Sequence, residues 1–297
     1  MTDSVFPENL IIVSGKGGVG KSSVAAATAR LLARSENTVL VTLDPHDAPH
    51  PVFDVPLRYE PIEVAPRLSV CRIEALAAVR EYVRRKLPFA GLYDAFLRGR
   101  MFRDFAEAAP GFRELMCLGK LYDLVTDSPF SRVVFDAPAT GHLKTLLDVA
   151  KTTLAAVHVG PLNHNARKIQ DLLLDPSRTR VLLVALPEEM ALREAGELQE
   201  FCRQRRMTVG PVVINQWVAQ RFSSDEVSAL RQLRGSAALS SAAAVCVGES
   251  ELAAVQAEAV ASLARSQRLH VPRFSDASTV HEKMIEALDR ELRSRVD

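Results

Sequence analysis

Short apolar runs that alternate with longer helical patterns are the feature of this sequence that most constrains its fold. Continuous apolar strands separated by helices are typical of a parallel sheet that is covered by helices on both faces. We therefore predict an α/β protein with a doubly wound, mostly parallel sheet. The predicted strands lie at residues 10–13, 39–43, 69–73, 133–135, 155–159, 181–186 and 212–214, and the first predicted helix lies at residues 22–34.

Two regions depart from this alternation. Residues 76–126 show a helical pattern broken by prolines and glycines, and we interpret them as a helical subdomain inserted between two strands. Residues 225–266 also predict helix, although their low-complexity tract at 236–244 is compatible with a loop. No linker separates independent units, so we predict a single domain over residues 1–297.

The composition excludes several broad classes of protein. The 37 Lys and Arg residues balance 36 Asp and Glu residues, and a formal net charge of +1 is no electrostatic footprint for nucleic acid. The four cysteines are scattered without a C-x-x-C pair, which predicts reduced thiols. We find no signal peptide and no run of about 18 apolar residues, so we expect a cytoplasmic protein without a transmembrane segment.

The last predicted helix places Met284, Ile285, Leu288 and Leu292 on one face. Its polar face mixes acidic and basic residues, without the basic excess that anionic lipids select. We expect this helix to pack onto the domain, with a peripheral membrane contact as the alternative.

Residues 15–22 have the sequence G-K-G-G-V-G-K-S, which fits the phosphate-binding pattern G-x-x-x-x-G-K-[ST] between a predicted strand and a predicted helix. Glycines permit backbone conformations in which successive N–H groups face phosphate oxygens, and the helix adds its positive end. Lys21 should reach the β- and γ-phosphates, and the Ser22 hydroxyl should ligate Mg²⁺. The predicted nucleotide-binding residues of this loop are Gly15, Gly17, Gly18, Val19, Gly20, Lys21, Ser22 and Ser23.

Lys16 is a second lysine in this loop, at a position that the general pattern leaves free. With it, the loop resembles the deviant Walker A loop of the ArsA, ParA and MinD group of P-loop ATPases. The resemblance implies a catalytic role for Lys16 across a dimer interface, where the extra lysine reaches the partner's nucleotide. It also implies ATP as the nucleotide and a dimer that encloses two ATP molecules.

Further motifs resemble those of the ArsA family and its eukaryotic relatives that target tail-anchored proteins. The apolar run 133–135 ends in Asp136, a Walker B arrangement in which Asp136 holds the Mg²⁺ shell. Residues 136–142 (D-A-P-A-T-G-H) resemble the family's D-T-A-P-T-G-H signature. Residues 186–188, followed by Glu194, resemble its I-P-E segment.

Three other matches lie on either side of these motifs. Residues 109–114 (A-P-G-F-R-E) resemble the A-P-G-x-x-E that opens a helix of the family's helical subdomain. Residues 213–216 (V-I-N-Q) resemble its V-N-Q motif, so the resemblance gives Asn215 a contact with adenine. Pro272 matches an adenine-side turn of the family, and the resemblance is in register from residue 10 to about residue 216.

The segment after the second predicted strand departs from the family. Asp44 and Pro45 match the start of the family's switch I, D-P-A-H-[NS]-L-S-D, and Asp44 is taken as a further Mg²⁺ ligand. Pro51 stands where the family has the aspartate thought to orient the attacking water, and proline has no acceptor for a water proton. Asp47 and Asp54 are the candidate replacements, and Asp47 is the predicted catalytic residue.

Neither known cargo of the family is supported. Residues 148–177 contain no methionine, so the long Met-rich insert with which tail-anchored-protein relatives bind a transmembrane helix is missing. Scattered cysteines do not supply the three converging thiolates that arsenite requires.

These observations predict an ATP-binding, slowly hydrolysing dimeric switch that uses Mg²⁺ and acts on a protein partner through its helical subdomain. The dimer is either a homodimer or a heterodimer with a paralogous subunit. Two alternatives stay open: a non-hydrolysing ATP-binding scaffold subunit beside an active paralogue, and a positioning ATPase of the ParA or MinD type.

Overall fold

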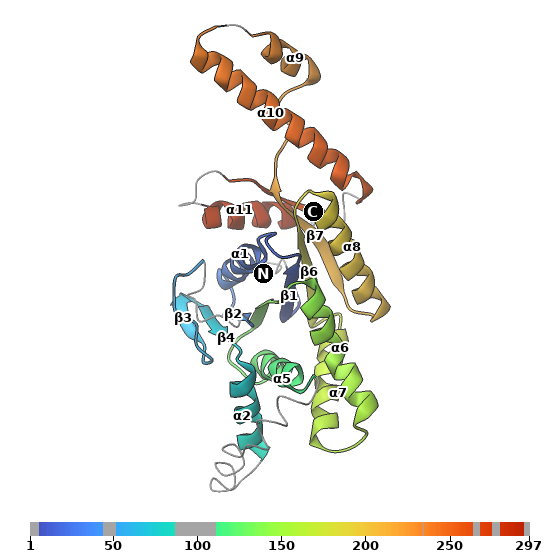
Figure 1. Cartoon of the computed structure of the whole chain (residues 1–297). Coiled ribbons are helices and arrows are strands. Elements are labelled where there is room, and N and C mark those ends of the chain that lie inside the picture. The colour runs from blue at the N-terminus through green and yellow to red at the C-terminus, as the bar shows by residue number, and fades with distance from the viewer. Residues whose placement is uncertain are drawn as a thin grey trace.

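A mostly parallel sheet forms the centre of the protein, as predicted. The computed structural model describes residues 6–43, 52–86, 111–233, 235–263, 268–274 and 280–293. Within these residues eight strands lie in the order β3-β4-β2-β5-β1-β6-β7-β8, and only β3 and β4 pair in antiparallel fashion (Figure 1). The strands are β1 (Leu10–Gly15), β2 (Thr38–Thr42), β3 (Ile62–Ala65), β4 (Leu68–Arg72), β5 (Arg132–Asp136), β6 (Thr179–Ala185), β7 (Val209–Trp217) and β8 (Arg268–Pro272).

Helices cover both faces of this sheet, which confirms the doubly wound α/β fold. On one face α1 packs against the central strands and against α11, and on the other face α5, α6, α7 and α8 pack against the sheet and one another (Figure 1). The helices are α1 (Lys21–Ala33), α2 (Ala75–Lys86), α5 (Phe112–Thr126), α6 (Thr140–Ala156), α7 (Pro161–Leu174), α8 (Glu189–Gln204), α9 (Ser224–Gln232), α10 (Ala237–Ala259) and α11 (Val280–Arg293).

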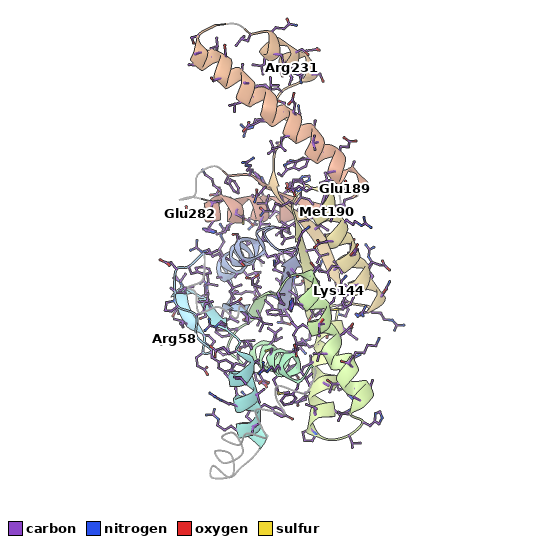
Figure 2. All side chains as sticks on the ribbon, viewed as in Figure 1. Arg58, Lys144, Glu189, Met190, Arg231 and Glu282 are labelled. Atoms are coloured by element: carbon purple, nitrogen blue, oxygen red, sulfur yellow. The ribbon has the colours of Figure 1, made fainter. Side chains whose placement is uncertain are left out.

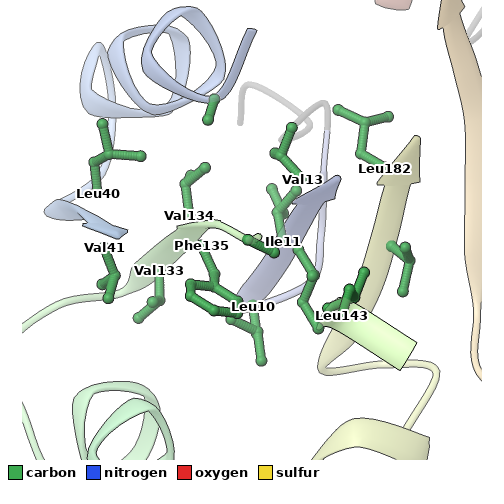
Figure 3. Close-up of a cluster of buried hydrophobic side chains, with 14 of the residues drawn as sticks. Leu10, Ile11, Val13, Leu40, Val41, Val133, Val134, Phe135, Leu143 and Leu182 are labelled. Carbon is green, nitrogen blue, oxygen red and sulfur yellow. The ribbon is translucent and has the colours of Figure 1, made fainter. Parts of the chain in front are cut away.

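The core lies where β1 is enclosed between β5 and β6 (Figure 3). Leu10, Ile11 and Val13 are fully buried, and Phe135 of β5 is 1% exposed, because helices cover the side chains on both faces of these strands. α1 is rich in buried alanines, and their small side chains bring this helix close to the sheet. The core therefore fixes the start of α1 relative to the end of β1.

The predicted strand at residues 155–159 is wrong. The helix α6 continues through Ala156, and the side chain of Val159 is 82% exposed. A short apolar run does not by itself distinguish a buried strand from the end of an amphipathic helix. Two edge elements are also not predicted from the sequence: the half-buried strand β3, and β8, of which only Pro272 is assigned, to a turn.

The predicted helical stretch at residues 225–266 is two helices, α9 and α10. The tract 237–244 is helical, so the loop interpretation of that tract is wrong. The expectation about apolar runs also needs correction. By length and composition α10 could cross a membrane: the mean hydropathy of its most apolar window is 1.3, and 17% of that window is buried.

The C-terminal helix α11 packs onto the domain, as expected. Its residues Met284, Ile285, Leu288 and Leu292 are all buried, and the helix contacts α1 and β8. Arg34, at the end of α1, donates to Asp289 of α11 at 3.1 Å. The apolar face of α11 is therefore covered by the protein itself.

The helices α2 and α5 lie between β4 and β5 in chain order. Residues 87–110 of the same region are outside the described residues. The interpretation of residues 76–126 as a helical subdomain, and of residues 1–297 as one domain, stays a prediction.

The burial of three of the four cysteines leads to a prediction about the reactivity of their thiols. It raises the pKa of Cys71 and Cys117 to about 12 and that of Cys202 to about 11, whereas Cys246 on α10 is only half-buried. Because the thiolate is the reactive form, we expect Ellman's reagent to modify Cys246 rapidly and the other three thiols only after unfolding in urea. The variant Cys246→Ser should lose the rapid phase, and a second rapid thiol in that variant would contradict the buried positions.

Candidate functional site

The loop at residues 15–22 connects the carboxyl end of β1 to the first turn of α1. Gly18 and Gly20 have φ angles of +82° and +90°, in the left-handed region that favours glycine. The helix begins at Lys21 after Gly20, which has no side chain with which to cap the first N–H groups. Uncapped N–H groups at a helix start, next to a left-handed glycine loop, form an anion-binding site.

The neighbouring strands fix the shape of this loop from behind. A Cβ atom on Gly15 would lie 2.1 Å from the backbone oxygen of Val184, so β6 leaves no room for a side chain there. The buried side chain of Asn215, on β7, donates from Nδ2 to the backbone oxygen of Val19 at 2.9 Å. Both contacts come from elements that are distant in sequence, so the loop conformation depends on the complete sheet.

Lys21 and Asp136 supply opposite charges beside the loop. The Lys21 ammonium donates to the backbone oxygen of Lys16 at 3.0 Å. Burial lowers the pKa of Lys21, and the negative charge of Asp136 opposes this effect. The carboxylate of Asp136 is at the end of β5, buried, in register with Val13 of β1. A cation that reaches over a glycine loop, with a carboxylate beside it, matches the groups that bind a phosphate and a divalent metal ion.

Lys16 forms an ion pair within its own chain. Its ammonium lies 3.0 Å from Oε1 of Glu194 on α8, and both side chains are about one-third exposed. The other oxygen of the same carboxylate, Oε2, accepts a hydrogen bond of 3.3 Å from Thr140, the first residue of α6. Glu194 therefore connects the loop to the segment that directly follows Asp136. The motif match had included Glu194 without indicating this role.

The donor set fits Mg²⁺ together with a nucleotide phosphate. Among the described residues no group of three or more His, Cys, Asp or Glu side chains converges to form a cage for a metal ion. Mg²⁺ does not need one, because it is commonly held by one or two carboxylates together with substrate phosphates. Ser22, half-buried in the first turn of α1, and Asp136 are the described residues that would hold it.

The strand β7 continues past Asn215 to Trp217, which the sequence analysis does not single out. The rings of Trp217 and His270 stack: their centroids lie 4.5 Å apart and the angle between their planes is 12°. Trp217 pairs with Pro272 across β7 and β8, and Gln216 has a φ of +58°. The signal for Trp217 is that it is the single tryptophan of the chain and directly follows the V-N-Q match. The adenine contacts of Asn215 and Pro272 stay predictions.

Part of the predicted site lies outside the described residues. Asp44 and Asp47, with Pro51, belong to that part, so their roles stay predictions. Asp54 is described: it is exposed, follows the turn at residues 52–53 and has a φ of +49°. The other predicted loop residues, with Asp136 and Asn215, come together at the carboxyl ends of β1, β5 and β7.

A comparison with protein-family models agrees with this geometry. Residues 8–159 match the model of the ArsA anion-transporting ATPases, which covers β1, the loop, β5 and α6. The chain belongs to the ArsA ATPase family. The family resemblance seen in the motifs is thereby confirmed.

Curated proteins similar to this ArsA-family chain carry ATPase names. The ATPase BagA of Mycobacterium tuberculosis is 29% identical over 238 residues, which are 74% of this chain and 68% of that protein. The arsenical pump-driving ATPase of Escherichia coli is 27% identical over 220 residues, 66% of this chain and 37% of that protein. An ATPase ASNA1 homologue of Plasmodium falciparum is 24% identical over 243 residues, 71% of this chain and 63% of that protein.

Two glycines of the loop make a matched test of its geometry. A Cβ atom on Gly20 would lie 2.4 Å from Nδ2 of Asn215, in a left-handed conformation, whereas a Cβ on Gly17 would meet no atom of the described residues within 4 Å. We expect Gly20→Ala to lower the free energy of unfolding by about 1–3 kcal/mol. Gly17→Ala should change it by less than about 0.5 kcal/mol. Urea denaturation measures both, and equal values for the two variants would contradict the Asn215 contact.

Proposed function

We propose that this chain is an ATP-binding, Mg²⁺-dependent ATPase that works as a dimeric switch on a protein partner in the cytoplasm. The observation that carries the proposal is the loop at residues 15–22. Its left-handed glycines, the uncapped start of α1, Lys21 and the adjacent Asp136 stand where a triphosphate with its metal ion would need them. The ATPase names of the relatives support the same chemistry.

The residues of this chain have separable tasks in that reaction. The loop N–H groups and Lys21 bind and orient the phosphates, and Ser22 with Asp136 holds the metal ion. Bound Mg²⁺ would neutralise phosphate charge and help to orient the phosphates. Asn215 keeps the loop in shape through its hydrogen bond to Val19.

The pairing of Lys16 with Glu194 supports a dimer in which Lys16 changes partner. An ion pair between side chains that are about one-third exposed contributes little, roughly 0–1 kcal/mol. A triphosphate on a facing subunit carries more negative charge than one carboxylate and forms stronger charge-assisted hydrogen bonds. Lys16 therefore exchanges Glu194 for the partner's nucleotide at small cost. In the nucleotide-free chain, the carboxylate of Glu194 neutralises the positive charge of Lys16.

The contacts of the Glu194 carboxylate also support a conformational switch. When Lys16 leaves, Glu194 keeps its hydrogen bond from Thr140, at the start of α6. The helix α6 packs against α5, which lies in the region assigned to the partner by resemblance. A change at the loop can thus move through α6 to α5. Two discrete positions of packed helices are a common form of such transitions.

Slow hydrolysis follows from the proline at position 51. Phosphoryl transfer depends mostly on positioning and electrostatic stabilisation, so turnover persists without a residue that orients the water. The missing acceptor at Pro51 equally favours the second candidate, a scaffold subunit that binds ATP without hydrolysing it. A positioning ATPase with a membrane-binding C-terminal helix is disfavoured, because the apolar face of α11 is buried in the domain.

Two substitutions should act on the dimer in opposite directions. Lys16→Ala should weaken ATP-dependent dimerisation by about tenfold or more, since a hydrogen bond between charged groups is lost, and leave ATP affinity nearly unchanged. Glu194→Gln should strengthen dimerisation by about two- to fivefold, since the competing ion pair within the chain is removed.

Sedimentation velocity with a slowly hydrolysed ATP analogue measures both effects. Lys151→Ala, which removes an exposed lysine of α6, serves as the control and should leave the dimer unchanged. A wild-type chain that stays monomeric with ATP, or a Glu194→Gln variant that dimerises less well than wild type, would contradict this mechanism.

Asp47 is the predicted replacement for the missing aspartate. If Asp47 orients the attacking water, Asp47→Asn should lower the single-turnover rate by about 10²- to 10⁴-fold with ATP affinity unchanged. Asp54→Asn, at an exposed position just after a turn, is the matched control and should change the rate little. Equal rates for wild type and Asp47→Asn would exclude this role. A wild-type rate equal to that of Lys21→Ala would instead favour the scaffold subunit.

A further inference from the structure

The helices α9 and α10 extend away from the body of the protein after β7, at the end opposite α2 (Figure 1). We refer to these two helices as the arm. α10 packs against α9, and its attachment to the body includes a hydrogen bond of 2.8 Å from the backbone N–H of Val218 to Gln256. Only 17% of the most apolar window of α10 is buried. Most of this long helix is therefore open to a partner.

One face of α10 is continuously uncharged. Seven residues recur at alternating intervals of three and four, which places them along one line of a helix. Six of them are exposed and the seventh is half-buried, and Val245 and Val255 are each 63% exposed. We call this line the α10 stripe; it consists of Ala238, Ser241, Val245, Gly248, Leu252, Val255 and Ala259.

The stripe is distinct from the face of α10 that packs within the arm. Four residues of α10 are buried, Ala243, Ser250, Ala253 and Gln256, and none of them belongs to the stripe. α10 therefore already has one packed face and presents a second one. Its spacing matches the a and d positions of a heptad, the pattern that packs against a second helix.

The charges beside the stripe indicate what kind of helix fits. When the stripe residues are numbered alternately as a and d positions, Glu251 and Glu258 fall at g positions and Glu249 falls at an e position. The e and g positions are the ones that select the partner in pairs of helices. Between Ala237 and Ala259 there is no Lys, Arg or His. The charged side chains of α10 that flank the stripe are therefore all carboxylates.

Arginines of the arm do not reverse this charge. Arg231 of α9, labelled in Figure 2, lies 2.7 Å from Glu251, and Arg221 lies 3.8 Å from Glu249, both in exposed positions. Residues 221–263, which include the arm and the segments on either side of its helices, contain three arginines against five Asp and Glu, so this part of the chain is acidic. Anionic lipids would be repelled by these flanks, and pairing α10 with α10 of a second copy supplies no opposite charge from that helix.

We propose that the α10 stripe binds a basic amphipathic helix of a partner protein. That helix would carry aliphatic side chains at a and d positions against the stripe and Lys or Arg at the flanking positions, opposite Glu249, Glu251 and Glu258. This surface is separate from the region of residues 76–126 that the proposed function assigns to a partner. The proposal does not depend on nucleotide hydrolysis.

The test uses the full chain and two synthetic helical peptides. Both have leucine at a and d positions; one has lysine at e and g positions, and the other has glutamate there. By fluorescence anisotropy we expect the lysine peptide to bind and the glutamate peptide to bind at least about tenfold more weakly. Binding of the lysine peptide should weaken as salt rises, because screening reduces the attraction to the acidic flanks.

Three variants assign the binding to the stripe. The double variant Val245→Ser and Val255→Ser should lower affinity about 30-fold, through the apolar contacts that it removes. The double variant Glu251→Gln and Glu258→Gln should lower it about threefold and flatten the salt dependence. Ala254→Ser, an exposed position of α10 outside the stripe, is the control and should bind like wild type. Circular dichroism checks that each variant keeps its helix content.

Several results would overturn the proposal. They are no binding of the lysine peptide, equal binding of the two peptides, and equal affinity of wild type and the valine double variant. Self-association that depends on Val245 and Val255 would identify a second copy as the occupant instead. Binding to phosphatidylglycerol or phosphatidylcholine vesicles without binding to the peptide would identify a lipid surface.

Discussion

The parallel pairing of β1 between β5 and β6 is the constraint on which the rest of the structure depends. It places the end of β1, the carboxylate of Asp136 and the backbone of Val184 at one edge of the sheet. The loop that follows has room only for glycine at position 15, and it turns directly into α1, whose alanines hold it close to the sheet. The phosphate-binding geometry is thus a consequence of strand order. The next strand, β7, also contributes, because its Asn215 donates a hydrogen bond to the backbone oxygen of Val19 in the loop.

Much of this fold could be predicted because fully buried strands produce continuous apolar runs. That rule fails where burial is partial or shared with a helix. The strand β3 is half-buried at the sheet edge and has no such run. Residues 155–159 have one, yet they belong to the end of α6 and the segment after it. A long apolar helix is normally buried, but only 17% of the most apolar window of α10 is buried. The composition of α10 therefore does not predict how exposed this helix is.

The candidate site was predictable to the extent that its residues are close in sequence. The loop at 15–22 and Asp136 follow from local patterns, each an apolar strand with a functional residue at its end. The pair of Lys16 with Glu194 joins residues from two distant segments, and the stacking of Trp217 on His270 requires β8 to lie beside β7. No local pattern contains such contacts. They depend on tertiary packing, which single-sequence reasoning does not determine.

The position of β1 in the sheet also has a consequence for biosynthesis. This first strand leaves the ribosome well before its partners β5 and β6 have been translated, and the Asn215 contact comes later still. Until then, a strand that begins with four apolar residues and has two free edges is available for wrong pairing, a condition that promotes aggregation of nascent chains. The loop cannot assume its ligand-binding form in a partial chain. An ArsA-family chain of this topology thus gains its nucleotide site only after most of its length has been made, and a chaperone that shields the N-terminal strand would act in that interval.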